Sequence, residues 1–348
     1  MNQKIKLSIG LSAVLCVFFL LLLLPAFIVL QGRSPESPPN VKISQPIESQ
    51  IKKEEAAVEV DSEPEQVITV YRANQETVEN VDLNDYVFGV LAGEMPASFE
   101  MEALKAQAVA ARTYIAQLVS QNGGKSDLPE GADVTDTVQH QVYYSNAELK
   151  KLWAADYQWK AEKIRQAVEE TDNLILTYEN RPIHALFFST SNGYTEHAEY
   201  YWKNPFPYLK SVKSPWDLDS PKYLKEQTFT LDDFNKKLEV SVKPGQKLLS
   251  SVKRTPGQAI ASVKIGGVVF TGRKVREQLG LASADFSMKW QGKKIVVTTK
   301  GYGHQVGMSQ YGANGMAKNG KTFEEILLYY YQGVTLEPGL SFFVDGKI

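Results

Sequence analysis

A short break between two helical patterns most constrains what this chain can fold into. Apolar residues recur at helical spacing from Leu83 to Leu91, and the pattern stops at the run Gly93-Glu94-Met95-Pro96. Because Pro96 biases Met95 away from helical backbone angles, the first helix is expected to end here. An alanine-rich pattern then predicts a second helix over about 99–121. The sequence therefore predicts two consecutive helices joined by a tight turn.

This turn places one carboxylate, Glu94, at the C-terminal end of the first helix, where the helix dipole disfavours negative charge. Leu91, Met95 and Phe99 are apolar neighbours that would partly remove water from Glu94. Both effects raise the pKa of a carboxyl group, as a general acid working near neutral pH requires. A solvated surface glutamate that tolerates a small penalty is the alternative, because glutamate side chains are mostly exposed.

The N-terminal region carries an almost unbroken apolar run over residues 7–30. A helix needs about 20 such residues to cross a bilayer. Lys4 and Lys6 precede the run, so we expect residues 1–6 to form a cytoplasmic tip. A cleaved signal peptide is the alternative, but the run is long and no clear small-x-small cleavage site follows it. We predict an uncleaved, single-pass anchor in the cell membrane, with the remaining chain on the extracytoplasmic side.

Residues 31–65 are rich in proline, serine and charge and lack apolar periodicity, which predicts a disordered, flexible linker. The folded domain is expected over 66–348. Helices and strands are interspersed there without a regular βαβ period, so the predicted fold class is α+β. Residues from about 222 to 291 read as a smaller inserted lobe, which would form a cleft with the rest of the domain.

Further elements are predicted from local patterns. In the main part we expect a first strand near Val67, a helical region over 146–170, a strand hairpin from 174–178 and 183–189, and a helix over 322–331. In the lobe we expect a strand and helix over 229–238, a strand pair over 259–269, a helix over 271–279, and strands around Phe286 and 295–297.

Several classes of function are disfavoured by the composition. A net charge of −2 argues against nucleic acid as a partner. The single cysteine, Cys16, lies inside the apolar run, which leaves the exported part without a disulfide, a thiolate metal site or a cysteine nucleophile. The 4 histidines are scattered, and neither a GxSxG motif nor a Walker loop is present.

The remaining possibility is a carbohydrate site. Such sites combine aromatic platforms with polar side chains that bind hydroxyl groups. Candidate platforms are Tyr143, Tyr144, Tyr194, Tyr200, Tyr201, Trp202 and Tyr208, and candidate polar groups are Lys105, Arg112, Ser189, Thr190 and Lys210. Each of these residues taken singly is also compatible with a structural role, because tyrosine and tryptophan pack cores and basic helix residues are usually solvated.

From about Val67 to the end, the chain resembles the stage II sporulation protein D family, because it carries several motifs in the order in which that family has them. These motifs are Leu91–Pro96, the alanine-rich helix Ala103–Tyr114, the loop Ser189-Thr190-x-x-Gly193-x-Thr195, the segment Pro207–Val212 and the loop Gly303–Ala313. The resemblance implies a peptidoglycan lytic transglycosylase of endospore formers. Such an enzyme cuts the β-1,4 bond between N-acetylmuramic acid and N-acetylglucosamine during engulfment of the forespore, leaving 1,6-anhydro ends.

By the resemblance, Glu94 is the catalytic acid/base. One carboxylate is enough for this reaction because the C6 hydroxyl of the sugar itself attacks, whereas ordinary glycosidases need a carboxylate pair. The positions assigned to substrate binding are Lys105, Arg112, Ser189, Thr190, Tyr208, Lys210, His304 and Gln310.

One motif departs from the family pattern. Many relatives carry His-Ser-x-Cys where this chain has Phe188-Ser189-Thr190-Ser191, so we predict neither a metal nor any other cofactor. The resemblance further implies glycan strands as substrate, with a peptide-removing amidase or endopeptidase and an integral membrane anchoring protein as partners between the mother-cell and forespore membranes. The alternative function is a non-catalytic glycan-binding module that stimulates a separate cell-wall amidase, as the amidase-modifier branch of the family suggests.

Overall fold

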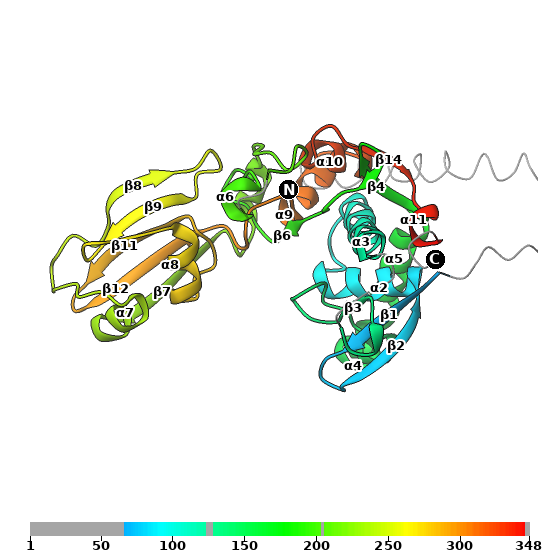
Figure 1. The fold of residues 1–348 in the computed structure, drawn as a ribbon, viewed down its shortest axis with the longest axis horizontal. Helices are drawn as coiled ribbons and strands as arrows, with labels where there is room; N and C mark the ends of the chain where they lie inside the picture. Colours follow the sequence, from blue (N-terminus) through cyan, green and yellow to red (C-terminus); the bar gives the residue numbers. More distant parts are fainter. Residues whose placement is uncertain (1–65, 123–127, 203–204, 345–348) are drawn as a thin grey trace, which may run out of the picture. The chain divides into compact units, whose positions relative to one another are not determined.

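A computed structural model describes residues 66–122, 128–202 and 205–344 (Figure 1). Among these residues, no helix combines the length and hydrophobicity needed to cross a membrane. The expected cytoplasmic tip (1–6), membrane anchor (7–30) and linker (31–65) lie outside the described residues.

The described chain begins with a small sheet. Strand β1 (Val67–Arg72) pairs antiparallel with β2 (Thr77–Asp82), and the short β3 (Val134–Thr135) pairs parallel with β1 on its other edge. Alternate residues of β1 are buried, as expected of a strand with one face on the core. The predicted strand near Val67 is confirmed.

Two helices follow, as the break at Pro96 predicted. Helix α2 (Leu83–Glu94) begins at Asp82, whose carboxylate accepts the backbone N–H groups of Asn84 and Asp85. It ends because Met95 adopts an extended conformation, with φ −130° and ψ 135°. Helix α3 (Met101–Asn122) follows, and its alanines are buried against neighbouring elements.

The predicted helical region over 146–170 is two helices. Helix α4 (Asn146–Trp153) begins with a capping box, in which Ser145 and Glu148 satisfy each other's backbone N–H groups. A 3₁₀ turn, η2 (Ala154–Asp156), separates it from α5 (Tyr157–Glu169). The positive φ of 46° at Ala154 interrupts the helix there. Another 3₁₀ turn, η1 (Pro129–Gly131), precedes β3.

The predicted hairpin forms only in part. Strand β4 (Leu174–Tyr178) pairs antiparallel with β14 (Thr335–Pro338) on one side and with β5 (Arg181–Pro182) on the other. Beyond the short β5, the Ile183 N–H still donates to the Leu176 carbonyl at 3.1 Å. The chain then leaves this sheet, and β6 (Phe187–Phe188) pairs parallel with β13 (Met308–Ser309).

The remaining elements of the main core are short helices. They are α6 (Glu199–Trp202), η3 (Pro215–Asp219), α9 (Gln310–Lys318), α10 (Phe323–Tyr330) and α11 (Ser341–Val344). The helix predicted over 322–331 is confirmed as α10. Helix α9 was not predicted, because Gly312 and Gly315 have low helix propensity and made this segment resemble a loop.

A second, separate core lies within the inserted segment. It is built from β7 (Leu224–Thr230), α7 (Leu231–Leu238), β8 (Ser250–Arg254), β9 (Ile260–Ile265), β10 (Val268–Phe270), α8 (Gly272–Leu279), β11 (Phe286–Gln291) and β12 (Lys294–Lys300). The strands form two sheets, in the orders β11-β12-β7 and β10-β9-β8 (Figure 1). The predicted elements of this segment are confirmed, and its buried apolar residues run from Phe229 to Val297. The described chain is an α+β protein with two cores.

Candidate active site

Glu94 is the last residue of α2, and its side chain is half-buried. Oε1 accepts a hydrogen bond of 3.3 Å from the backbone N–H of Val142. Burial raises the pKa of Glu94 above its ordinary value, and the Val142 N–H opposes part of this rise by stabilising the charged form. Among the described residues no other charged group shifts this pKa. Burial of Glu94 therefore favours its protonated form.

Two glycines bring the Val142 segment close to α2. Gly89 and Gly93 lie one turn apart on the same face of the helix. A Cβ atom at Gly89 would lie 2.5 Å from the carbonyl oxygen of Tyr144, and one at Gly93 would lie 3.1 Å from the Tyr144 ring. The Tyr144 N–H donates to the Gly89 carbonyl at 3.4 Å. Sequence analysis missed Val142, although glycine spaced by four in a helix is a signal of close backbone approach.

The first half of α9 holds the turn that carries Glu94. The Gln310 side-chain amide donates to the backbone carbonyl of Glu94 at 3.0 Å. The Asn314 side-chain oxygen accepts the N–H of Glu100 at 2.8 Å, and the ring of Tyr311 meets that of Phe99 edge-on at 4.9 Å. Gln310, which was predicted to bind substrate, thus contacts the backbone of Glu94 through its side-chain amide. Asn314 was not among the predicted residues.

Ser189 and Thr190 lie at the junction with the Gly-rich loop. The Ser189 carbonyl accepts the N–H of Tyr311 at 3.0 Å, which connects this loop to the start of α9. Thr190 exchanges backbone hydrogen bonds with Tyr302 at 3.0 and 2.7 Å, and its buried hydroxyl bonds to that of Ser220 at 2.9 Å. Through α9, the structure therefore brings Ser189, Gln310 and Glu94 into one connected region.

A buried carboxylate, Asp217, ties the same loops together. It accepts the Ser191 N–H at 2.8 Å, the Ser191 hydroxyl at 2.8 Å and the Ser214 hydroxyl at 2.6 Å, and it also accepts the Ser309 hydroxyl. Burial raises its pKa, and these hydrogen bonds oppose the rise. Ser191 is therefore engaged in this network. Within the described ranges, no group of three His, Cys, Asp or Glu side chains could hold a metal ion.

His304 lies among aromatic rings. The ring centroids of Phe188, Tyr201 and Trp202 are 5.8, 5.7 and 5.3 Å from that of His304. Burial, helped by the charge of Arg276, lowers the pKa of His304 to about 4, so the ring is neutral at pH 7. Together with Tyr200, Tyr201 and Arg276, His304 lines a pocket of about 240 Å³.

Lys105 and Arg112 share one face of α3, as their spacing predicted, and both face the C-terminal end of α5. Lys105 forms ion pairs with Glu102 at 2.8 Å and Glu170 at 2.5 Å. Arg112 is only 1% exposed and donates to backbone carbonyls, at 2.7 Å for Thr171. Burial lowers the pKa of Arg112 to about 10, which leaves it charged at neutral pH. The structure thus places Arg112 in the core.

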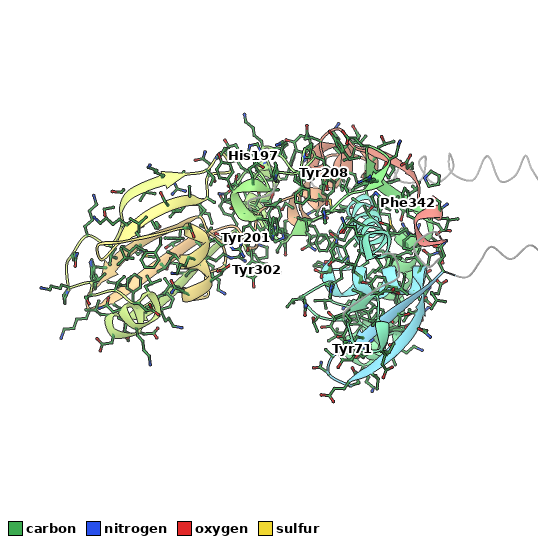
Figure 2. All side chains as sticks on the ribbon, viewed as in Figure 1. Tyr71, His197, Tyr201, Tyr208, Tyr302 and Phe342 are labelled. Atoms are coloured by element: carbon green, nitrogen blue, oxygen red, sulfur yellow. The ribbon has the colours of Figure 1, made fainter. Side chains whose placement is uncertain are left out.

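Tyr208 and Lys210 lie on the segment that follows α6, the helix that carries Tyr201 of the His304 cluster; Figure 2 labels Tyr208 and Tyr201. Tyr208 is buried, and its hydroxyl accepts the N–H of His184 at 3.1 Å. It lines a pocket of about 790 Å³. Lys210 lies 3.8 Å from the carboxylate of Glu199.

Comparison with known proteins agrees with the motifs. The model of the stage II sporulation protein family matches residues 71–178. Stage II sporulation protein D of Bacillus subtilis (strain 168) is 53% identical over 79% of this chain and 80% of its own length. The protein of the same name from Bacillus amyloliquefaciens is 48% identical over 94% of this chain and 95% of its length. The amidase enhancer of Bacillus subtilis is 30% identical over 71% of this chain and 40% of its length. The matched segment contains α2, Glu94 and the Val142 donor, and the chain belongs to the stage II sporulation protein D family.

Proposed function

We propose that this chain is a sporulation lytic transglycosylase that cleaves the bond between N-acetylmuramic acid and N-acetylglucosamine in peptidoglycan glycan strands. One observation carries the proposal. Glu94 is a half-buried carboxyl group whose pKa is raised by burial, and no second carboxylate among the described residues shifts this pKa. A hydrolase that uses water normally requires a carboxylate pair, whereas intramolecular attack by a sugar hydroxyl requires one.

In the proposed reaction, protonated Glu94 donates its proton to the glycosidic oxygen as the bond from that oxygen to C1 of the muramyl sugar breaks. The resulting carboxylate accepts the proton of the C6 hydroxyl, whose oxygen bonds to C1 and closes the 1,6-anhydro ring. Glu94 ends in its starting protonation state. The N–H of Val142 stabilises the intermediate carboxylate, and burial favours the starting acid, so the two opposing effects support the two halves of the cycle.

The other assigned residues have different parts in this proposal. Ser189 is connected to the Glu94 turn through α9, and Tyr208, Lys210 and His304 remain proposed glycan contacts. The buried Thr190 hydroxyl, which bonds to that of Ser220, favours a structural role for Thr190. For Lys105 and Arg112, the contacts with α5 favour a positioning role, in which they fix α3 and therefore the turn before it.

We further propose that the domain acts while anchored in the cell membrane, between the mother-cell and forespore membranes. Removal of stem peptides by an amidase or endopeptidase would supply the denuded strands, and an integral membrane protein would hold the enzyme in the engulfment complex. Membership of the stage II sporulation protein D family supports this part of the proposal.

The test is a product assay on denuded glycan strands, with detection of anhydro-muramyl ends by mass spectrometry. Glu94→Gln should lower product formation by at least about 100-fold, because it removes the transferable proton and nearly conserves shape. Glu162→Gln, an exposed glutamate on α5, is the matched control and should retain wild-type activity. Absence of anhydro ends with the wild type, or equal product from Glu94→Gln, would overturn the proposal.

A second candidate is a glycan-binding module that stimulates a separate amidase. The relative named amidase enhancer favours it. Under this function, the chain would bind glycan strands, form no anhydro ends, and increase the rate of an added amidase equally well with and without Glu94→Gln.

A further inference from the structure

We propose that the pocket between the end of α3 and the β4–β5 turn is a second saccharide subsite, apart from Glu94. Its volume is about 790 Å³. Ligand sites commonly occupy about 300–1,000 Å³. Neither Glu94 nor its partners Val142 and Gln310 line it, so it is a site of its own. The inference takes its ligand class from the proposed function and is independent of the chemistry at Glu94.

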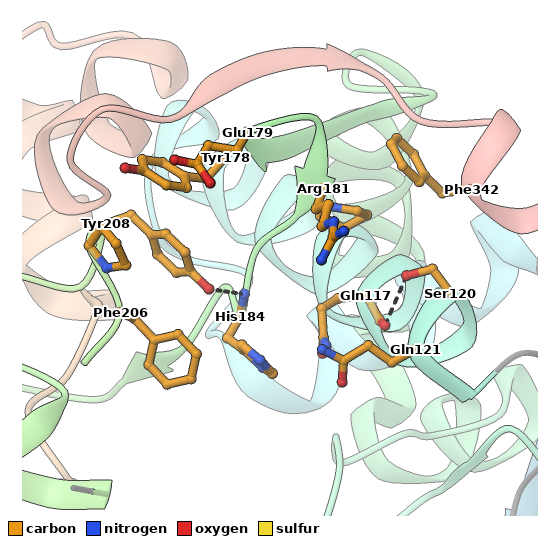
Figure 3. A pocket seen from close by; sticks show the side chains of 12 residues that line it. Gln117, Ser120, Gln121, Tyr178, Glu179, Arg181, His184, Phe206, Tyr208 and Phe342 are labelled. Carbon is orange, nitrogen blue, oxygen red and sulfur yellow. Dashed lines mark hydrogen bonds between the residues drawn. The ribbon is translucent and has the colours of Figure 1, made fainter. Parts of the chain in front are cut away.

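One wall of the pocket is aromatic. The Tyr208 ring lies 5.5 Å from Tyr178 and 5.8 Å from Phe206, centroid to centroid, and both pairs are tilted (Figure 3). The hydrogen bond from the His184 N–H fixes the Tyr208 hydroxyl. Aromatic rings that are held in place in this way offer apolar faces at little entropic cost. The C–H face of a pyranose ring is a matching partner.

The opposite wall is polar and includes a group without a partner. The Gln117 side chain is 4% exposed, and its Nε2 has no hydrogen-bond partner among the described residues. Buried amides are normally satisfied, so each exception requires an explanation. Figure 3 shows Gln117, Gln121, Arg181 and His184 turned toward the same space. Gln117 Nε2 is shielded from solvent, so a turn of its amide toward the pocket would let an acetamido carbonyl or a sugar hydroxyl accept its N–H.

The charges at the pocket favour a neutral ligand. Arg181 and Glu179 are both exposed at the β4–β5 turn, so the rim carries charges of both signs. Burial lowers the pKa of His184, which keeps that ring uncharged at neutral pH. An N-acetylated sugar combines an apolar ring face with neutral donors and acceptors, and it fits both walls.

The test is calorimetric titration of the full chain with an N-acetylglucosamine tetramer, in a Glu94→Gln background that prevents turnover. Gln117→Leu and Arg181→Gln should each raise Kd about fivefold or more, since the first removes a hydrogen-bonding amide and the second replaces the long guanidinium with a shorter, neutral amide. Arg165→Gln, whose side chain lies outside the pocket in an ion pair with Asp85, is the matched control and should leave Kd unchanged. Gln117→Leu should also raise Tm by a few degrees, because it removes an unsatisfied buried amide.

Each outcome decides the question. Unchanged Kd in both pocket variants, or binding of inorganic phosphate in place of the tetramer, overturns the inference. A lower Tm for Gln117→Leu together with unchanged Kd assigns the glutamine to the core alone and also overturns it. If pocket variants weaken binding while the wild type forms no anhydro ends, the subsite stands and the proposed reaction fails. If anhydro ends form while Kd is unaffected, the subsite alone fails.

Discussion

At the scale of single residues, the protonation state of Glu94 depends on two opposing effects. Removal from water favours the neutral acid, and the Val142 N–H favours the carboxylate. Burial is the larger contribution, so the pKa is raised. One backbone donor is a weak stabiliser compared with the two or three N–H groups that strongly depress a carboxyl pKa. Burial therefore favours the protonated acid that would start the proposed reaction, and the Val142 N–H would stabilise the carboxylate that follows.

This balance has a consequence for stability. Because the pKa of Glu94 is higher in the folded chain than its ordinary value of 4.5, the wild type loses stability as pH rises through the folded pKa. Glu94→Gln carries no ionisable group there and avoids this loss. We expect the Tm of Glu94→Gln minus that of the wild type to increase with pH above about 4.5, measured by thermal melts across a pH series.

The control for this measurement is Glu162→Gln, which replaces an exposed glutamate outside the site. Its Tm difference from the wild type should stay nearly constant across the same series. A Tm difference between Glu94→Gln and the wild type that is the same at every pH would contradict the raised pKa of Glu94.

Residue spacing predicted which face of a helix some site residues occupy, but it did not predict what those residues contact. Lys105 and Arg112 do share a face of α3, because two helical turns separate them. The spacing could not show that this face meets the end of α5, where Arg112 satisfies backbone carbonyls. Cations are favoured at a helix C-terminus, which gives both residues a structural reason to be there. Glu94 was predictable because Pro96, its near neighbour in sequence, fixes its place.

At the scale of elements, prediction succeeded where the pattern was local and failed where a distant segment decided the outcome. The ends of α2 are set by Asp82 and Pro96, both adjacent in sequence. Helix α9 contains glycines because Tyr330 and Trp216 approach Gly312 and Gly315 closely, and those contacts are invisible in the local sequence. The pairing of β6 with β13 was not predicted either, because it joins segments that lie far apart in the chain.

The close packing of the Tyr143–Tyr144 segment on α2 yields a graded prediction. Replacing glycine by alanine in a helix normally stabilises it by about 1 kcal/mol. At Gly89 the new Cβ would collide with the Tyr143 ring and the Tyr144 carbonyl, whereas at Gly93 the nearest atoms lie 3.1 and 3.2 Å away. Gly89→Ala should therefore destabilise the chain by about 1–3 kcal/mol in denaturant unfolding. It should also lower activity, because the segment that carries Val142 must move.

Gly93→Ala serves as the matched variant on the same helix face. It should cost less stability than Gly89→Ala, since its neighbours need to move by only a few tenths of an ångström. Equal stabilisation by both substitutions would show that the Val142 segment is not packed on α2 as described.

At the scale of the whole molecule, the described chain has two independent apolar cores. The main core takes residues from both sides of the inserted segment, up to Leu209 and again from Val306. The second core lies entirely between Phe229 and Val297. Hydrogen bonds join the two parts, such as those from the Asn192 side chain to Gly257 and Asp285 and from Arg273 to the Tyr201 carbonyl. Each core therefore has the apolar contacts it needs within its own segment.

This organisation predicts that the inserted segment can be removed. Leu224 and Lys300 are opposite partners at the end of the β7–β12 ladder, and the Gly301 N–H donates to the Tyr223 carbonyl at 2.7 Å. Replacing 224–300 with Gly-Gly in residues 66–348 should thus leave a chain that still melts cooperatively. Its Tm should fall, because Asn192 and Glu196 lose their partners in the removed segment. The isolated segment 223–301, as the matched control, should melt cooperatively as well, and loss of a cooperative transition in the shortened chain would show that the main core depends on the insertion.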